Sequence, residues 1–193
     1  MWNCIKVADF NKDGDVDFVV GNIGENNRYH FLGTKPLTIY GADYDNNGRW
    51  DAIPSYFLKG TEYLISSRDE FVRQILSFNA KFNSYSLYAK ATMAEVFSEE
   101  QRKSATIIEV FLRESYYIEN LGNQQFKLRA LPNESQWSVT QDIFIDDFNE
   151  DGNLDVILIG NDYGVEPVFG RYDASYGVVL RFFVNFGERL LLL

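Results

Sequence analysis

A nine-residue pattern rich in Asp and Asn occurs three times in the sequence. The copies are DFNKDGDVD at 9–17, DYDNNGRWD at 43–51 and DFNEDGNLD at 147–155. All three fit D-[FY]-[ND]-x-[DN]-G-x-[apolar]-D, with glycine always at position 6. A pattern that repeats in register restricts the fold strongly, because each copy must form the same local structure between similar flanking elements.

The residue types in this pattern are those that bind a hard cation. Calcium takes about six to eight oxygen ligands, and such loops supply them from side chains at positions 1, 3 and 5 and from a backbone carbonyl at position 7. Glycine at position 6 permits the sharp turn. Position 9 adds another carboxylate. We therefore predict up to three Ca²⁺ ions, with backbone carbonyls contributed by Asp15, Arg49 and Asn153 and side-chain ligands from Asp9, Asn11, Asp13, Asp17, Asp43, Asp45, Asn47, Asp51, Asp147, Asn149, Asp151 and Asp155.

Each loop crowds three carboxylates of this ligand set into nine residues. Without a cation these charges repel one another, so we expect each loop to be ordered only when an ion is bound. The alternative is a polar turn that is held by Asp and Asn side-chain hydrogen bonds and contains no ion.

The residues around the loops argue against an EF-hand. An EF-hand needs a bidentate Glu at position 12 and a helix on each side, but position 12 is Val20, Pro54 and Leu158. The segments after each loop are rich in β-branched and aromatic residues, which are typical of strands, and so are 5–8, 37–40 and 142–145 ahead of them. The predicted unit is therefore strand, loop, strand. Residues at positions 2 and 8 are predicted to anchor each loop to a core: Phe10, Val16, Tyr44, Trp50, Phe148 and Leu154.

The composition fits one globular domain with a sizeable core. The chain has 193 residues, of which 46% are hydrophobic. Its net charge of -10 disfavours nucleic acid and anionic membranes as partners, and three ions of charge +2 would bring this charge to -4. No apolar run approaches the roughly 18 residues of a membrane span. The single cysteine, Cys4, is predicted to be a small buried apolar residue.

A helical segment is predicted between the second and third loops. Ser67 and Glu70 form a capping box, and an apolar stripe at helical spacing follows through 71–82. A second helix is expected over 88–96 and a short third one after Ser98. Strand patterning returns over 106–119, then a hairpin turn at 120–123 leads into 125–131. A further strand is expected over 178–183, with a similar turn at 185–187, whereas 161–177 has no regular period.

The loop between two strands, together with the hairpin ENLGNQQF at 119–126, resembles the FG-GAP (VCBS) repeat. The wider sequence, including SRDEFVRQ at 67–74 and GRYDASYG at 170–177, is similar to a group of bacterial secreted or surface proteins of Bacteroidetes type. The Gly-Ala-Pro of the repeat is replaced by Gly21-Asn22 and Gly160-Asn161, and Asn47 stands where Asp is usual.

The resemblance implies a mainly β fold, a partial β-propeller built of calcium-binding blades with a helical insertion at about 67–104. We predict one propeller-type domain or a fragment of one, with two blades in 1–60, the insertion in 61–105 and further blades in 106–193. A propeller closes with about four to eight blades, so an unclosed set is expected to be part of a larger protein and to self-associate through open sheet edges. Its signal peptide is expected to lie outside this sequence.

The function that the resemblance implies is a calcium-stabilised extracellular, cell-surface or periplasmic module that binds or scaffolds a protein or glycan ligand. The alternative is a carbohydrate-binding lectin, with Trp137, Tyr163 or Tyr172 as stacking platforms, or a glycan-processing enzyme component using Glu166 and Asp173. Enzyme activity is not favoured, because the only histidine, His30, lies in an aromatic strand-like run, and no phosphate-binding or zinc motif is present.

Overall fold

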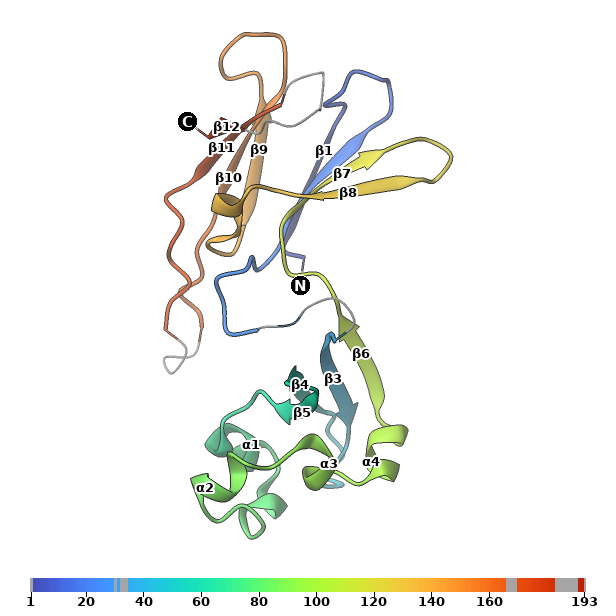
Figure 1. Cartoon of the computed structure of the whole chain (residues 1–193), viewed down its shortest axis with the longest axis vertical. Coiled ribbons are helices and arrows are strands. Elements are labelled where there is room, and N and C mark those ends of the chain that lie inside the picture. The colour runs from blue at the N-terminus through green and yellow to red at the C-terminus, as the bar shows by residue number, and fades with distance from the viewer. Residues whose placement is uncertain (1, 30, 32–34, 166–169, 183–190, 193) are drawn as a thin grey trace. The chain divides into compact units, whose positions relative to one another are not determined.

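Antiparallel strands are the main regular secondary structure of the described residues. The computed structural model describes residues 2–29, 31, 35–165, 170–182 and 191–192. Its strands form three four-stranded sheets, and the helices are short (Figure 1). The chain divides into two compact units, one comprising Met1–Arg28 and Leu112–Leu193 and the other Tyr29–Phe111. The mainly β class is confirmed, whereas closure into a propeller stays a prediction.

The first unit contains two sheets, each of which is a meander of strands in sequence order. One sheet has the order β1-β2-β7-β8, and the other has the order β12-β11-β10-β9. The bounds are β1 (Cys4–Ala8), β2 (Asp17–Gly21), β7 (Tyr116–Asn120), β8 (Phe126–Ala130), β9 (Asp142–Asp146), β10 (Asp155–Ile159), β11 (Val178–Arg181) and β12 (Leu191–Leu192). The predicted hairpin near residue 120 is confirmed as the β7–β8 pair. Since β2 pairs with β7, the second unit is an insertion in the sequence between two neighbouring strands of the first sheet.

One hydrophobic core joins these two sheets. Alternate residues of a strand point to opposite faces of its sheet, and the inward ones here include Val19 and Tyr117 from the first sheet and Val156 and Leu180 from the other. All four are at most 2% exposed. Phe10 belongs to the same core. Because it is position 2 of the loop at 9–17, core packing anchors the start of that loop.

The second unit has one sheet covered by helices. Its strands lie in the order β5-β4-β3-β6, with bounds β3 (Leu37–Ala42), β4 (Asp51–Leu58), β5 (Thr61–Leu64) and β6 (Thr106–Val110). The core combines Ile53 of β4 with aromatic and aliphatic side chains of the helical segment, among them Phe71, Ile75, Met93 and Phe97. The aromatic stripe seen in the sequence therefore packs on a sheet.

The helical insertion predicted at about 67–104 is confirmed, but it is more broken than expected. It contains α1 (Arg68–Gln74), the 3₁₀-helix η1 (Leu76–Asn79), α2 (Tyr85–Tyr88), α3 (Met93–Val96) and α4 (Glu99–Ser104). The capping boxes that begin at Ser67 and Ser98 are both present. The single helix expected over 88–96 is wrong, because Thr92 and Glu95 form a third capping box that begins a new helix.

The single strand expected over 106–119 is also wrong. Its two halves are β6 and β7, which belong to different sheets. The break lies at Ser115, whose backbone N–H donates to the Gln136 side chain at 2.8 Å and whose hydroxyl accepts from the Asn22 backbone at 3.0 Å. Gln136 belongs to the 3₁₀-helix η2 (Asn133–Gln136). A buried polar network, which has no periodicity in sequence, thus ends one strand and starts the next.

Gly160 occupies a place where a side chain does not fit. A Cβ there would lie 2.2 Å from the Val139 carbonyl oxygen and 2.3 Å from the Gln141 backbone nitrogen. We expect Gly160→Ala to lower the free energy of unfolding by about 3 kcal/mol, as overpacking against backbone does. Urea unfolding would measure this loss. Gly164→Ala is the matched control, because its Cβ would meet only the Asp162 side chain at 3.3 Å; equal effects of the two variants would contradict the prediction.

No helix in the described part of the chain has the length and apolar character that would let it cross a membrane.

Candidate metal centre

Each of the three loops connects two neighbouring antiparallel strands. The connections are β1 to β2, β3 to β4 and β9 to β10. The Asp at position 9 is in each case the first residue of the second strand, and it pairs with the last residue of the first strand: Asp17 with Ala8, Asp51 with Ala42 and Asp155 with Asp146. The predicted strand, loop, strand unit is confirmed for all three copies.

The three loops share one backbone conformation. Position 4 is left-handed in every copy, with φ of 64° at Lys12, 57° at Asn46 and 59° at Glu150. The glycine at position 6 also has positive φ, at 94°, 80° and 85°. A left-handed non-glycine residue costs roughly 1–2 kcal/mol, so three such residues at equivalent positions require compensating interactions within each loop.

Side-chain to backbone hydrogen bonds supply this compensation. The carboxylate at position 1 accepts from the backbone N–H groups of positions 5 and 6, at 3.2 and 3.0 Å for Asp9, 3.0 and 2.9 Å for Asp43, and 3.0 and 2.7 Å for Asp147. The oxygen at position 3 accepts from the position 5 N–H as well. The carboxylates are therefore folded over their loops, and each ionised oxygen retains capacity for a further partner.

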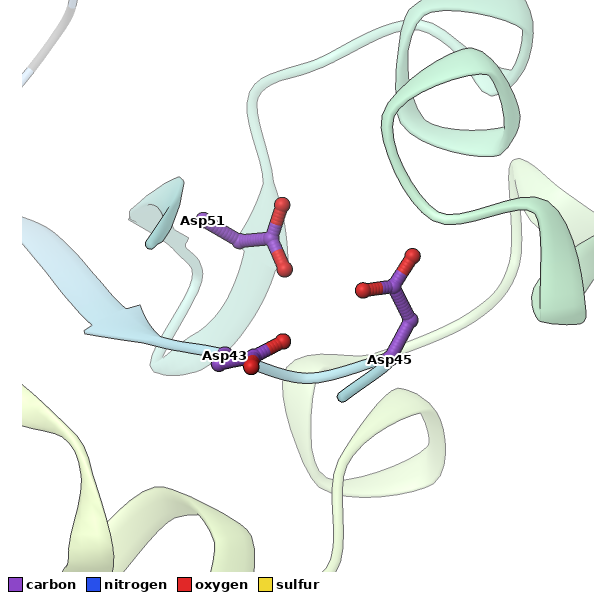
Figure 2. A group of neighbouring side chains, drawn as sticks. All are labelled: Asp43, Asp45 and Asp51. Atoms are coloured by element: carbon purple, nitrogen blue, oxygen red, sulfur yellow. The ribbon is translucent and has the colours of Figure 1, made fainter. Parts of the chain in front are cut away.

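The second loop gathers three carboxylates closely. One oxygen each of Asp43, Asp45 and Asp51 lies within 4.8 Å of the others, and Figure 2 shows the two loop side chains facing Asp51 on β4. Oxygen atoms that share a Ca²⁺ at about 2.3–2.6 Å lie at such separations from one another. These residues could hold a metal ion. Among the described residues, no other three acidic side chains come this close to one another.

A helix of the insertion supports this cluster. Gln74, the last residue of α1, donates its side-chain amide to Asp51 Oδ1 at 3.2 Å, while the Tyr44 backbone N–H donates to Asp51 Oδ2 at 3.2 Å. The carboxylate of Asp51, which is 5% exposed, is thus oriented from two sides. Sequence reasoning missed Gln74, because no pattern connects a helix end to a loop 23 residues away.

The first and third loops differ from the second in which positions carry carboxylates. Both have Asn at position 3, so besides positions 1 and 9 their carboxylate stands at position 5. The position 5 side chain accepts from the N–H of position 7 at 2.8 Å in all three loops, and it is a carboxylate, of Asp13 or Asp151, only in the first and third. This explains why the predicted ligands of these two loops form no equally close acidic group.

In the first loop each oxygen of the position 9 carboxylate has a hydrogen-bond partner within the protein. Asp17 is 0% exposed. Its Oδ2 accepts from the Tyr117 hydroxyl at 2.6 Å, and its Oδ1 accepts from the Asn120 backbone N–H at 2.8 Å. Both partners lie on β7, so Asp17 ties the loop to the next strand of the sheet. The sequence gives no signal for Tyr117, which is 100 residues away.

In the third loop the equivalent carboxylate retains a free oxygen. Asp155 is 2% exposed, and its Oδ1 has no hydrogen-bond partner among the described residues. Burial raises the pKa of this carboxyl, and the nearby Asp151 raises it further, while Arg181 and the Phe148 backbone N–H oppose the increase. An orphaned buried oxygen beside a second carboxylate is the environment that a bound cation would satisfy.

The predicted anchoring of positions 2 and 8 holds for only half of these residues. Phe10 lies in the first core, Leu154 packs against that core, and Tyr44 packs against the core of the second unit. The prediction is wrong for Val16, Trp50 and Phe148, which are 51%, 55% and 49% exposed.

Of the residues considered for other functions, the three aromatic ones belong to neighbouring segments, because the Tyr172 carbonyl accepts from the Ser138 hydroxyl at 2.7 Å. Trp137 and Tyr163 are exposed, whereas the Tyr172 hydroxyl is buried and its backbone pairs with Asp162. Asp173 is exposed. His30, Glu166 and the turn expected at 185–187 fall outside the described residues.

Cys4 behaves largely as the sequence predicts. It is a half-buried free thiol that packs against the core of the first unit, and burial raises its pKa.

No protein-family model matches this chain, and no curated protein or solved structure is significantly similar to it.

Proposed function

We propose that the chain is a calcium-stabilised binding or scaffold module of the FG-GAP/VCBS type, whose loops each hold one Ca²⁺ between two strands of a blade. The observation that carries the proposal is one loop conformation built three times at equivalent hairpins, with three carboxylates within 4.8 Å in the second copy. The buried unpartnered oxygen of Asp155 supports a cation in the third copy as well.

The ligands in this proposal are the oxygen-bearing residues of the three patterns. Calcium would be structural in them, because it would neutralise clustered carboxylates and hold the two strand ends together. Ca²⁺ sites of extracellular modules belong to the weaker class, with dissociation constants of about 0.1–1 mM. An extracellular or cell-surface location, where such calcium concentrations prevail, is part of the proposal.

The proposed module would contact further blades or another copy of the chain. The outward face of the first sheet carries large apolar residues on its edge strands: Ile5 and Val7 on β1, and Phe126 and Leu128 on β8, are 45–58% exposed. Strand register places Val7 and Leu128 in one cross-strand row. Apolar groups of this size normally pack against another layer, as expected for a blade whose neighbour is missing. A protein or glycan ligand would bind the completed assembly.

Calcium titration of loop variants tests the proposal. We expect isothermal titration calorimetry to show calcium binding to the whole chain, and the double variant Asp43→Asn with Asp45→Asn to lose the binding of one ion. The control is Glu99→Gln with Glu100→Gln, which removes the same charge from the exposed α4 of the same unit. Unchanged stoichiometry in the loop variant would assign the second loop no ion, and no calcium binding by the unaltered chain would refute the proposal.

A further inference from the structure

The first and third loops are connected by a lysine. Lys12, at position 4 of the first loop, donates its Nζ to the Gly152 carbonyl at 2.8 Å and to Asn153 Oδ1 at 3.2 Å. Gly152 and Asn153 are positions 6 and 7 of the third loop. Both loops belong to the first unit, and Figure 1 shows them at the same end of its two sheets.

The contact reaches a predicted ligand of the third loop through one intermediate. Asn153 donates its side-chain Nδ2 to Asp151 Oδ1 at 3.0 Å, and its backbone N–H donates to the same oxygen at 2.8 Å. Because Lys12 donates to the one oxygen of this side-chain amide, it fixes which way the amide faces. A side chain from the neighbouring loop therefore adds a second support to the Asp151 carboxylate, beside the Asn153 backbone N–H.

The position of Lys12 depends in turn on its own loop. Its left-handed backbone, with φ of 64°, is enclosed by the bonds that Asp9 and Asn11 accept from the Asp13 backbone. A cation held by the first loop would neutralise its carboxylates and stabilise this conformation. Ordering the first loop would thus place the Lys12 ammonium where it organises the third.

We propose that Lys12 couples the two loops, so that cation binding at the first loop increases the cation affinity of the third. This inference rests on the proposed function. A loop that is already organised loses less conformational freedom when it binds its ion, which gives the coupling its positive sign. The ammonium also repels a cation nearby, but its charge is exposed to solvent and is therefore screened. Reciprocity requires that an ion in the third loop favours binding at the first by the same factor.

The test compares the third-loop affinity with and without a competent first loop. All proteins carry Asp43→Asn and Asp45→Asn, which leave two sites, and calcium binding is followed through the Gly14 and Gly152 amide resonances in ¹H–¹⁵N spectra. Disabling the first loop with Asp9→Asn and Asp13→Asn should weaken calcium binding at Gly152 roughly five-fold, the lower range of measured couplings. With Lys12→Met in the background, the same change should leave the Gly152 affinity unaltered.

The control is Lys6→Met. Lys6 on β1 links the same two sheets by an ion pair with Asp142 at 3.6 Å, away from the loops. It should preserve the coupling. The inference is overturned if the affinity at Gly152 is independent of the first loop, or if the dependence persists in Lys12→Met. Absence of any calcium-induced shift at either glycine would instead refute the part of the proposed function that places ions in the first and third loops.

A calcium-free measurement separates the contact from the ions. In chelator, Lys12→Met should accelerate hydrogen exchange of the Asp151 and Asn153 amides, which are bonded to loop oxygens, whereas Lys6→Met should not. Equal exchange in Lys12→Met and the unaltered chain would show that Lys12 does not organise the third loop.

Discussion

Removal of calcium with EDTA should lower the melting temperature of the protein by roughly 5–10 °C for each occupied loop that unfolds with the transition. A ligand present at about 100 times its dissociation constant stabilises the folded state by about 2.7 kcal/mol. For chains of about 150–250 residues, each kcal/mol changes the melting temperature by roughly 2–4 °C. Differential scanning fluorimetry in EDTA and in excess calcium measures the difference.

The physical reason is the charge in the loops. In the second loop three carboxylates lie within 4.8 Å, and two of them are at least partly buried. Their repulsion persists in the folded state until a cation binds, but the unfolded chain separates them. Adding calcium after EDTA should therefore restore the original melting temperature. Magnesium is the control ion, because it demands a smaller octahedral shell. A melting temperature that does not respond to EDTA would contradict the structural role of calcium.

The local structure of the loops could be predicted from sequence because it depends on neighbouring residues. The glycine at position 6, the Asp and Asn spacing and the β-branched flanks together predicted each strand, loop, strand unit, now seen at the hairpins closed by Asp17, Asp51 and Asp155. The capping boxes at Ser67 and Ser98 are local in the same sense.

Contacts between distant residues could not be predicted in this way. The pairing of β2 with β7 spans the whole inserted unit, and the network around Ser115 that separates β6 from β7 depends on residues at 22 and 136. For the same reason the sequence did not show that Gln74 supports the second loop or that Lys12 reaches the third.

Asp17 and Asp155 occupy the same position in the pattern, yet their replacement by Asn should have opposite effects in the absence of calcium. In EDTA, Asp17→Asn should lower the free energy of unfolding by about 2 kcal/mol, because the new amide nitrogen faces either the Tyr117 hydroxyl or the Asn120 N–H, both donors to Asp17. Asp155→Asn should raise it by about 1 kcal/mol, because it removes a buried charge with an unpartnered oxygen.

Calcium should make the unaltered chain more stable than the Asp155→Asn variant, which reverses their order in EDTA. With excess calcium the unaltered chain should gain stability from an ion in the third loop. The Asp155→Asn variant should not, because it lacks the carboxylate whose oxygen has no partner within the protein. Urea unfolding measures the free energy of unfolding of both variants, in EDTA and in calcium. Tyr117→Phe removes one donor to Asp17 and should reproduce about half of the Asp17→Asn loss. If Asp155→Asn destabilised the calcium-free protein as much as Asp17→Asn does, both carboxylates would be paired within the protein. Equivalent positions in a repeat would then have equivalent roles, whereas the hydrogen bonds of Asp17 tie two strands together and Asp155 keeps an unpartnered oxygen that a cation would satisfy.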